Sequence, residues 1–448
     1  MLGVLAWKLL RDRVGALLAG TLFALHPAQT ESVAWVTVPD PLMAVAVLGS
    51  LLLYLGYRDR ASADDHAHAE KSKRRSHKQL HATSQSWSSA WWLIASATAC
   101  LAAQLAKETA IVLPAVFFAA ALIIPVGRPA RVEAAHGQGF AAQLASAFRE
   151  SLPFLGVTLV YLLLRLNALG ERFSPLTQHL PWTTVLLSWP ATLWFYVKVL
   201  FWPVVPRAFA DPSLADTFSL HGVLWPGLGV CCSIAVMAWA FQWAWRKARR
   251  DLPSREGVGV ERALLWGTLI LVLPILLTLN LNGLNPGDFL HGRYTYLPLA
   301  GGMLLLATGW HLVRKGRVVL LSAAALLTVA FGVLTVEQES AWKDDLTLFT
   351  VAHQNAPNNA PVAQNLARAH VQLALGLDEE GRCDEAVPIF KQAIEQYPQD
   401  WFAWAGLGEC FIQLKDLPKA EQSLRRASEL SPDSGPRARC SARSGEPQ

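Results

Sequence analysis

The sequence predicts an all-α protein with two parts: a polytopic membrane helix bundle, followed by a short α-solenoid of helical repeats. The chain has 448 residues, of which 52% are apolar and only 16% charged. Its apolar residues gather in blocks of membrane length, which a soluble protein does not need. After residue 336 the blocks stop and a polar, periodic helical pattern begins. We expect a membrane domain over 1–336, helical repeats over 337–434 and a disordered tail over 435–448.

Ten apolar segments form the predicted membrane domain, and the first is short for a span of about 20 residues. They fall at 14–26, 41–57, 91–105, 109–125, 151–166, 183–203, 221–245, 263–279, 296–312 and 318–335. The formal charge of +5 does not indicate nucleic-acid binding, because the basic residues lie in the short connections between these segments.

The basic residues predict the orientation, since Lys and Arg concentrate in cytoplasmic connections. They cluster before the first segment, after the second, fourth and seventh, and before the last. Three apolar segments lie between residues 150 and 246. All five basic clusters can lie on the same side of the membrane only if one of these three does not cross it. We assign 183–203 as a re-entrant or interfacial segment, because Pro190 and Pro203 interrupt it and it contains Lys198. Nine spans and an N-terminal stub remain, with a cytoplasmic polar loop at 58–90 and an outer loop at 167–220 that contains the re-entrant segment.

The two ends and the cysteines carry little further information. The start, MLGVLAWKLLRDR, resembles the last turns of a membrane helix and not a cleavable signal peptide, so we expect an N-terminally truncated gene product. Six cysteines without a C-x-x-C pair indicate neither a zinc motif nor a disulfide framework. The histidines of the 58–90 loop could form a metal-binding tract, but its low-complexity composition favours a solvated cytoplasmic linker.

A repeat pattern begins after Trp342. Pro357, Pro398 and Pro432 close successive units that are 41 and 34 residues apart. Small and apolar residues recur at the offsets of the tetratricopeptide repeat, in which small residues let two antiparallel helices pack closely. In the last unit they are Trp404, Leu407, Gly408, Phe411, Ala420 and Ala427; the unit before it matches at Leu366, Ala367, Ala386 and Ala393 and carries seven extra residues around 376–382. Two and a half repeats are marginal alone, so we expect them to rest on the membrane domain or to continue in a longer chain.

The polar residues on the predicted outer side lie between apolar helices, where ionisable groups are costly unless they face water, protein or substrate. The segment LLAGTLFALHPAQTESVAWVTVPDPLMA carries His26, Glu31 and Asp40. Its alternative interpretation is a helix cap with a solvated loop. Lys107 and Glu108 lie at the outer end of two segments and are functional candidates on that side. The alternative interpretation is that their side chains reach the membrane interface or pair with each other.

The segment HGRYTYLPLAGG opens the ninth apolar segment. Arg293 suits bidentate phosphate binding, and Tyr294 and Tyr296 offer ring faces and hydroxyls. An interfacial belt of Tyr and Arg is the alternative, but it does not explain the polar residues crowded just before: Asn282, Asn285, Asp288 and His291. No P-loop, dinucleotide fingerprint, nucleophile elbow or HExxH motif is present in the sequence, so soluble-enzyme chemistry is not supported.

Four motifs occur in one order along the chain: HPAQTESVAWVTVPDPLMA, AKETAIVLP, RYTYLPLAG and a W-x-D-x-x-x-L-F linker into the repeats. This order resembles the transmembrane-and-tetratricopeptide-repeat O-mannosyltransferases and their bacterial relatives, which have the GT-C glycosyltransferase fold. The resemblance implies transfer of a sugar, typically mannose, from a polyprenyl-phosphate carrier to a protein hydroxyl on the periplasmic or lumenal face. The repeats would hold the acceptor polypeptide. The implied partners are the bilayer, the lipid-linked sugar and the acceptor, with no nucleic acid.

The resemblance also implies roles for residues. The family's catalytic base lies in the first outer loop, which we expect ahead of this chain, so the base is unassigned and Glu31 and Asp40 are supporting candidates. Gly292 stands where relatives commonly carry an acidic residue, and Val38-Pro39-Asp40 keeps only the Asp of a G-R-x-D motif. The implied donor-phosphate residues are Arg293, His291, Tyr294, Tyr296 and Lys107, with His26 and Glu108 as further outer-face candidates. No metal ligand is predicted, and the residues do not decide whether a divalent metal assists.

Two other functions stay open at this stage. A non-catalytic scaffold would use the spans only to anchor the repeats for protein–protein interaction, but nine spans are more than a tether needs. A transporter would show paired broken helices and charges at mid-membrane. Here the charges lie at the ends of the segments.

Overall fold

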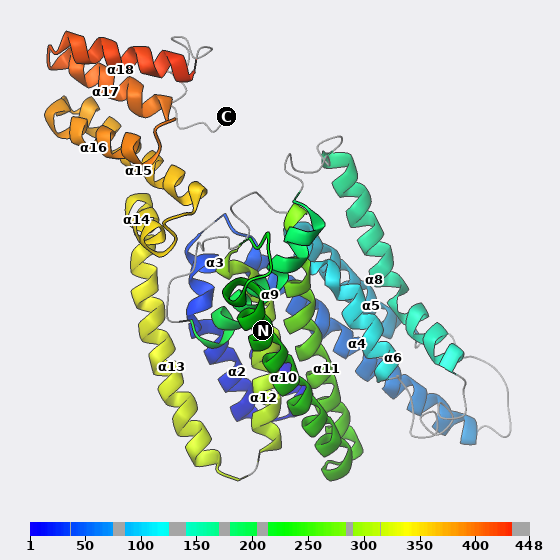
Figure 1. The fold of residues 1–448 in the computed structure, drawn as a ribbon. Helices are drawn as coiled ribbons and strands as arrows, with labels where there is room; N and C mark the ends of the chain where they lie inside the picture. The colour runs from blue at the N-terminus through cyan, green and yellow to red at the C-terminus, as the bar shows by residue number, and fades with distance from the viewer. Residues whose placement is uncertain are drawn as a thin grey trace. The chain divides into compact units, whose positions relative to one another are not determined.

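The computed structural model describes residues 1–35, 37–74, 86–124, 140–169, 180–203, 214–283, 290–313 and 315–431. The described residues form helices joined by turns and short irregular connections, without a strand, so the predicted all-α class is confirmed (Figure 1). The chain divides into a first unit that ends at Glu337 and a second that begins at Gln338. Asn285, Asp288 and the predicted tail at 435–448 lie outside the described residues.

The first unit is a bundle of apolar helices. They are α1 (Leu2–Leu10), α2 (Arg13–Leu25), α3 (Thr30–Ala34), α4 (Asp40–Arg74), α5 (Ser86–Ala106), α6 (Leu113–Ile123), α8 (Phe140–Leu169), α9 (Trp182–Phe201), α10 (Trp225–Asp251), α11 (Ser254–Leu277), α12 (Tyr296–Leu312) and α13 (Arg317–Glu339). Each of the ten predicted apolar segments overlaps one of these helices. Within the described residues, six helices are long and apolar enough to cross a membrane, and three shorter apolar helices lie at Arg13–Leu25, Ala90–Ala106 and Glu108–Ile123.

Close helix crossings set the positions of the connecting segments. α12 packs against α11 and α2 (Figure 1), and a Cβ on Gly301 would lie 2.5 Å from the Gly267 carbonyl oxygen of α11. Small residues at such crossings let membrane helices approach closely. α2 and α12 run antiparallel, since Phe23 near the end of α2 meets Tyr296 at the start of α12 with ring centroids 5.4 Å apart. The segment after α2 therefore lies beside the segment before α12.

The structure corrects two details of the first unit. α9 is one continuous helix, so the predicted interruption at Pro190 was wrong. Proline removes a single backbone hydrogen bond, and a membrane helix supported by neighbours tolerates it, as α8 and α11 do at Pro153 and Pro274. α4 continues to Arg74, through the first half of the predicted polar loop. The Ala, Arg, Glu and Lys residues there have high helix propensity and allow α4 to continue once it has started.

The second unit consists of antiparallel helix pairs. Its helices are α14 (Asp345–Asn355), α15 (Ala360–Glu379), α16 (Cys383–Gln396), α17 (Trp401–Gln413) and α18 (Leu417–Leu430). The small residues at the repeat offsets are buried, with Ala386 and Ala393 fully inaccessible. Asn359, Asp400 and Asp416 cap α15, α17 and α18, respectively, through their side-chain oxygens. The tetratricopeptide arrangement is confirmed, and the extra residues of the second repeat lengthen α15 instead of forming a loop.

Candidate functional site

Three connecting segments meet at one end of the first unit's helices. The first runs from His26 to Asp40 and contains the short helices η1 (Pro27–Gln29) and α3. The second is Lys107 with η2 (Glu108–Val112), and the third is His291 with η6 (Gly292–Thr295). η6 packs against η1 and α3, and η2 packs against α5 and α11. The sequence breaks helices here through Pro27 at the first position of η1 and through the Thr30 hydroxyl, which donates to the Pro27 carbonyl.

Asp40 and Lys107 form a buried ion pair between the first and second segments. The Lys107 ammonium donates to both carboxylate oxygens of Asp40, each at 2.6 Å. The Asp40 side chain is only 3% exposed and the Lys107 side chain only 10%. The attraction between charges strengthens in a low-dielectric environment, but each charge depends on its partner to compensate the loss of water. The pair therefore fixes the start of α4 to the end of α5.

Glu31 joins the first segment to the third. The Arg293 backbone N–H donates to Glu31 Oε2 at 2.9 Å, and Arg293 Nη1 lies 3.6 Å from Oε1. His291 Nδ1 lies 3.1 Å from the same Oε1. Glu31 and His291 are 4% and 1% exposed. A carboxylate this deeply buried needs such donors, so Glu31 positions the His291–Arg293 turn.

Aromatic rings connect the two ion pairs into a single cluster. The Tyr294 ring has the Lys107 ammonium 5.2 Å and the Arg293 guanidinium carbon 5.6 Å from its centroid. Arg293 also lies 5.1 Å from the ring of Trp35. Such contacts attract a cation to the ring face and hold it in place. We call the group of Glu31, Asp40, Lys107, His291, Arg293 and Tyr294 the carboxylate–cation cluster.

Sequence reasoning missed several residues beside this cluster. Trp35 was not a candidate, although it belongs to the quoted SVAWV motif. Tyr196 of α9 is fully buried and lies within electrostatic range of Glu31 and Arg293. The Gln29 amide and the Ser32 hydroxyl are buried without a hydrogen-bond partner in the described part of the chain. The only signal in the sequence for Gln29 and Ser32 is that they lie within two residues of Glu31.

The remaining predicted residues lie outside the cluster or at its border. His26 is buried, with Nε2 3.1 Å from the Leu200 carbonyl oxygen, and it accepts from the Ala28 N–H through Nδ1. Tyr296 packs its ring on Phe23 at the start of α12. Glu108 is 60% exposed and lies 3.5 Å from Arg165 of α8. Lys107 and Glu108 therefore have different partners, and the alternative that they pair with each other was wrong.

A second polar group lies at the opposite end of α2 and α12. His311 lies 3.5 Å from Asp12 and 3.0 Å from Glu256. Asp12 also caps the start of α2, so these contacts join α2, α11 and α12. They match the demands of helix capping and interhelical pairing, and we assign them a structural role.

The carboxylate–cation cluster offers two cations, two carboxylates and an aromatic face, but no cysteine or serine placed as a nucleophile among its members. Guanidinium and ammonium groups held this way suit the recognition of a phosphate group. The fold and the cluster together define a multi-pass membrane protein with a polar cluster at one end of its bundle and tetratricopeptide repeats at its C-terminus.

Comparison with known proteins identifies similar chains. A tetratricopeptide repeat family model matches residues 379–442. The chain is 28% identical over 470 residues to the protein O-mannosyl-transferase Tmtc1 of Drosophila melanogaster, covering 88% of this chain and 50% of that relative. It is also 28% identical over 186 residues to Tmtc3 of the same organism, covering 40% of this chain and 19% of the relative. Human TMTC1 is 30% identical over 154 residues, covering 33% and 16%.

The chain thus spans about half the length of the first of these relatives and less of the others. No solved structure matches it. The resemblance inferred from the ordered motifs is confirmed, because the similarity to the protein O-mannosyl-transferase Tmtc1 extends over most of the chain.

Proposed function

We propose that this protein is a membrane glycosyltransferase of GT-C type. It transfers a sugar, mannose, from a polyprenyl-phosphate carrier to a hydroxyl group of a protein. The observation that carries the proposal is the carboxylate–cation cluster: Lys107 and Arg293, distant in sequence, share the Tyr294 ring and are each held by a buried carboxylate. The similarity to protein O-mannosyl-transferases supports the choice of reaction.

Arg293 is the main phosphate ligand in this proposal. Its backbone N–H, not its guanidinium, makes the hydrogen bond to Glu31, and its Nη1 is 3.6 Å from the carboxylate. Its side chain is 18% exposed, more than that of any other charged member of the cluster. The guanidinium can thus turn two donors toward a phosphate. Charge on the departing phosphate grows as the bond to the sugar breaks, so a fixed cation stabilises the transition state more than the ground state.

The two carboxylates act as supports in this scheme. Asp40 holds Lys107 and Glu31 holds the His291–Arg293 turn, and each keeps its cation in place before the donor arrives. Proton removal from the acceptor hydroxyl requires a general base, which this proposal leaves unassigned. The hydroxyl oxygen attacks the anomeric carbon, the bond from that carbon to the phosphate oxygen breaks, and the phosphate leaves with the electron pair.

The repeats hold the acceptor polypeptide in this proposal. Tetratricopeptide pairs bury their small residues against each other and leave an extended surface for a peptide. We place the cluster and the repeats on the periplasmic or lumenal face, because the basic connections that favour the cytoplasm flank the opposite ends of the helices.

Transfer of radiolabelled mannose from polyprenyl-phosphate mannose to protein tests the proposal, measured in membranes that express this chain with and without the coding sequence upstream of it. Arg293→Ala should lower the rate by about 10²-fold or more, as loss of a charge-stabilising donor does in other enzymes. Arg165→Ala is the matched control, because Arg165 is a cation of the same unit that pairs with an exposed Glu108 outside the cluster. It should change the rate less than about threefold.

Equal rates for wild type and Arg293→Ala would overturn the assignment of the phosphate site. No transfer by a folded chain that still binds peptide through its repeats would favour the scaffold function instead.

A further inference from the structure

The extra residues of the second repeat lengthen one helix and bring a carboxylate to two cysteines. α15 has 20 residues, whereas its counterpart α17 in the next repeat has 13. The extension places Asp378 in the last turn of α15. Cys383 begins α16 and Cys410 lies in α17, so the three residues come from three different helices. Ligands on three helices leave no short sequence motif, which explains why cysteine spacing gave no signal.

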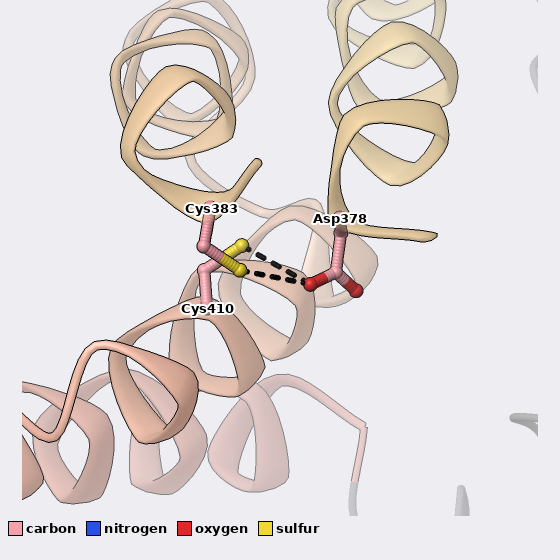
Figure 2. Close-up of side chains that lie close together, drawn as sticks. All are labelled: Asp378, Cys383 and Cys410. Atoms are coloured by element: carbon pink, nitrogen blue, oxygen red, sulfur yellow. Dashed lines mark hydrogen bonds between the residues drawn. The ribbon is translucent and has the colours of Figure 1, made fainter. Parts of the chain in front are cut away.

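The three side chains point toward one another (Figure 2). Asp378 Oδ1 lies 3.0 Å from Cys383 Sγ and 3.4 Å from Cys410 Sγ. The three candidate ligand atoms all lie within 4.8 Å of one another. Cys383 and Cys410 are 2% and 0% exposed. Gln413 Nε2 donates to the same Asp378 oxygen at 2.8 Å and holds the carboxylate in this orientation.

These separations suit a tetrahedral cation. Zinc bonds of about 2.3 Å to sulfur and about 2.0 Å to oxygen place neighbouring sulfur and oxygen ligands about 3.5 Å apart, and two sulfurs about 3.8 Å apart. The sulfur–oxygen distances of 3.0 and 3.4 Å are already close to that edge length. Two thiolates and a carboxylate are also the ligand types that zinc prefers over magnesium or calcium.

We propose that Asp378, Cys383 and Cys410 form a binding site for one thiophilic divalent cation of the zinc type, with water as the fourth ligand. Gln413 orients the carboxylate from outside the ligand set, a role common around zinc sites. Binding of the cation displaces the proton of each thiol. The affinity for the cation therefore increases with pH.

The site connects neighbouring repeats. Asp378 and Cys383 belong to the second repeat, whereas Cys410 belongs to the third. Short repeat arrays depend on the interface between neighbours for their stability. A cation bound only by the folded arrangement contributes its binding free energy to folding, so it stabilises this interface directly.

Cobalt titration of the purified full-length chain in detergent tests the proposal, with a purification tag that lacks histidine. Bound Co²⁺ reports thiolate ligands through its sulfur-to-metal charge-transfer absorption, and metal analysis gives the stoichiometry. We expect one Co²⁺ per chain, displaced by Zn²⁺. Cys410→Ser and Cys383→Ser should each weaken binding by at least about 10-fold, and Asp378→Asn should weaken it while leaving the thiolate absorption.

The double variant Cys231→Ser/Cys232→Ser is the matched control, because these exposed thiols lie on α10 in the other unit. It should keep full binding. Circular dichroism identifies any variant that fails to fold, and Asp378→Asn, which keeps both thiols, tests the ligand set if a Ser variant unfolds. Three outcomes would overturn the proposal. They are the absence of stoichiometric Co²⁺ binding, loss of binding in the Cys231→Ser/Cys232→Ser control, and a disulfide between Cys383 and Cys410 in the isolated protein.

Discussion

Removal of the Lys107 ammonium should destabilise the first unit far more than removal of an exposed cation. Lys107→Met keeps most of the side-chain volume and leaves Asp40 buried without its cation. The Asp40 side chain is 3% exposed, so water cannot replace the two hydrogen bonds of 2.6 Å. Leaving one partner of a buried ion pair uncompensated costs about 3–5 kcal/mol. We expect a loss of that size in the free energy of unfolding.

Arg165→Met is the matched control for this prediction. Its partner Glu108 is 60% exposed and Arg165 itself 36%, so water screens this pair and its removal should cost about 0.2–1 kcal/mol. The free energies can be measured by reversible denaturation in mixed detergent micelles. Adding Asp40→Asn to Lys107→Met should recover about 1–3 kcal/mol, because it removes the orphaned charge. A loss no larger than that of the control, or a double variant that loses the sum, would refute the reasoning.

Three further predictions concern helix packing and the pH dependence of stability. Gly301→Ala should lower the stability of the first unit by about 1–3 kcal/mol, because the new Cβ would lie 2.5 Å from the α11 backbone. Gly309→Ala on the same helix is the control: its Cβ meets nothing within 4 Å, so this variant should be neutral or stabilising. Equal effects of the two variants in a thermal unfolding assay would contradict this. Burial raises the pKa of Asp400, so its contribution to stability is lost as pH rises through the folded value, and Asp400→Asn should stabilise the repeats at neutral pH. Hydrogen bonds from Thr347 lower the pKa of Asp344, so its contribution to stability is present at neutral pH and lost on acidification. Asp344→Asn should therefore destabilise the repeats only at neutral pH. At neutral pH, protection from hydrogen exchange should rise in α17 of Asp400→Asn and fall in α14 of Asp344→Asn, and changes of the same sign would refute the assignment.

The periodic parts of the structure were predictable from the sequence. The spacing of small residues in a repeat, such as Ala386 and Ala393, follows from the way its two helices pack. Both residues are fully buried, as that packing requires. Each apolar helix of the first unit could likewise be predicted from the composition of its own segment. These features need no knowledge of distant residues.

The pairing within the cluster was not predictable. Lys107 and Glu108 are adjacent in sequence, yet one pairs with Asp40 and the other with Arg165. Glu31 and Arg293 are 262 residues apart, and only the antiparallel packing of α2 on α12 brings them together. Partner choice of this kind depends on tertiary packing, which residue types and spacing do not encode. The predicted interruption of α9 at Pro190 was wrong for the same reason, since neighbouring helices support the continuous helix.

The carboxylate–cation cluster pairs two anions with two cations, so the formal charges of Glu31, Asp40, Lys107 and Arg293 cancel. A balanced group produces little field beyond its immediate surroundings, whereas an unbalanced basic patch attracts anions over roughly a Debye length of about 8–10 Å. An anionic ligand would therefore meet these cations by lateral diffusion and short-range contact, without long-range attraction. Its association rate should change little with ionic strength, in contrast to the steep salt dependence of ligands captured by open basic surfaces.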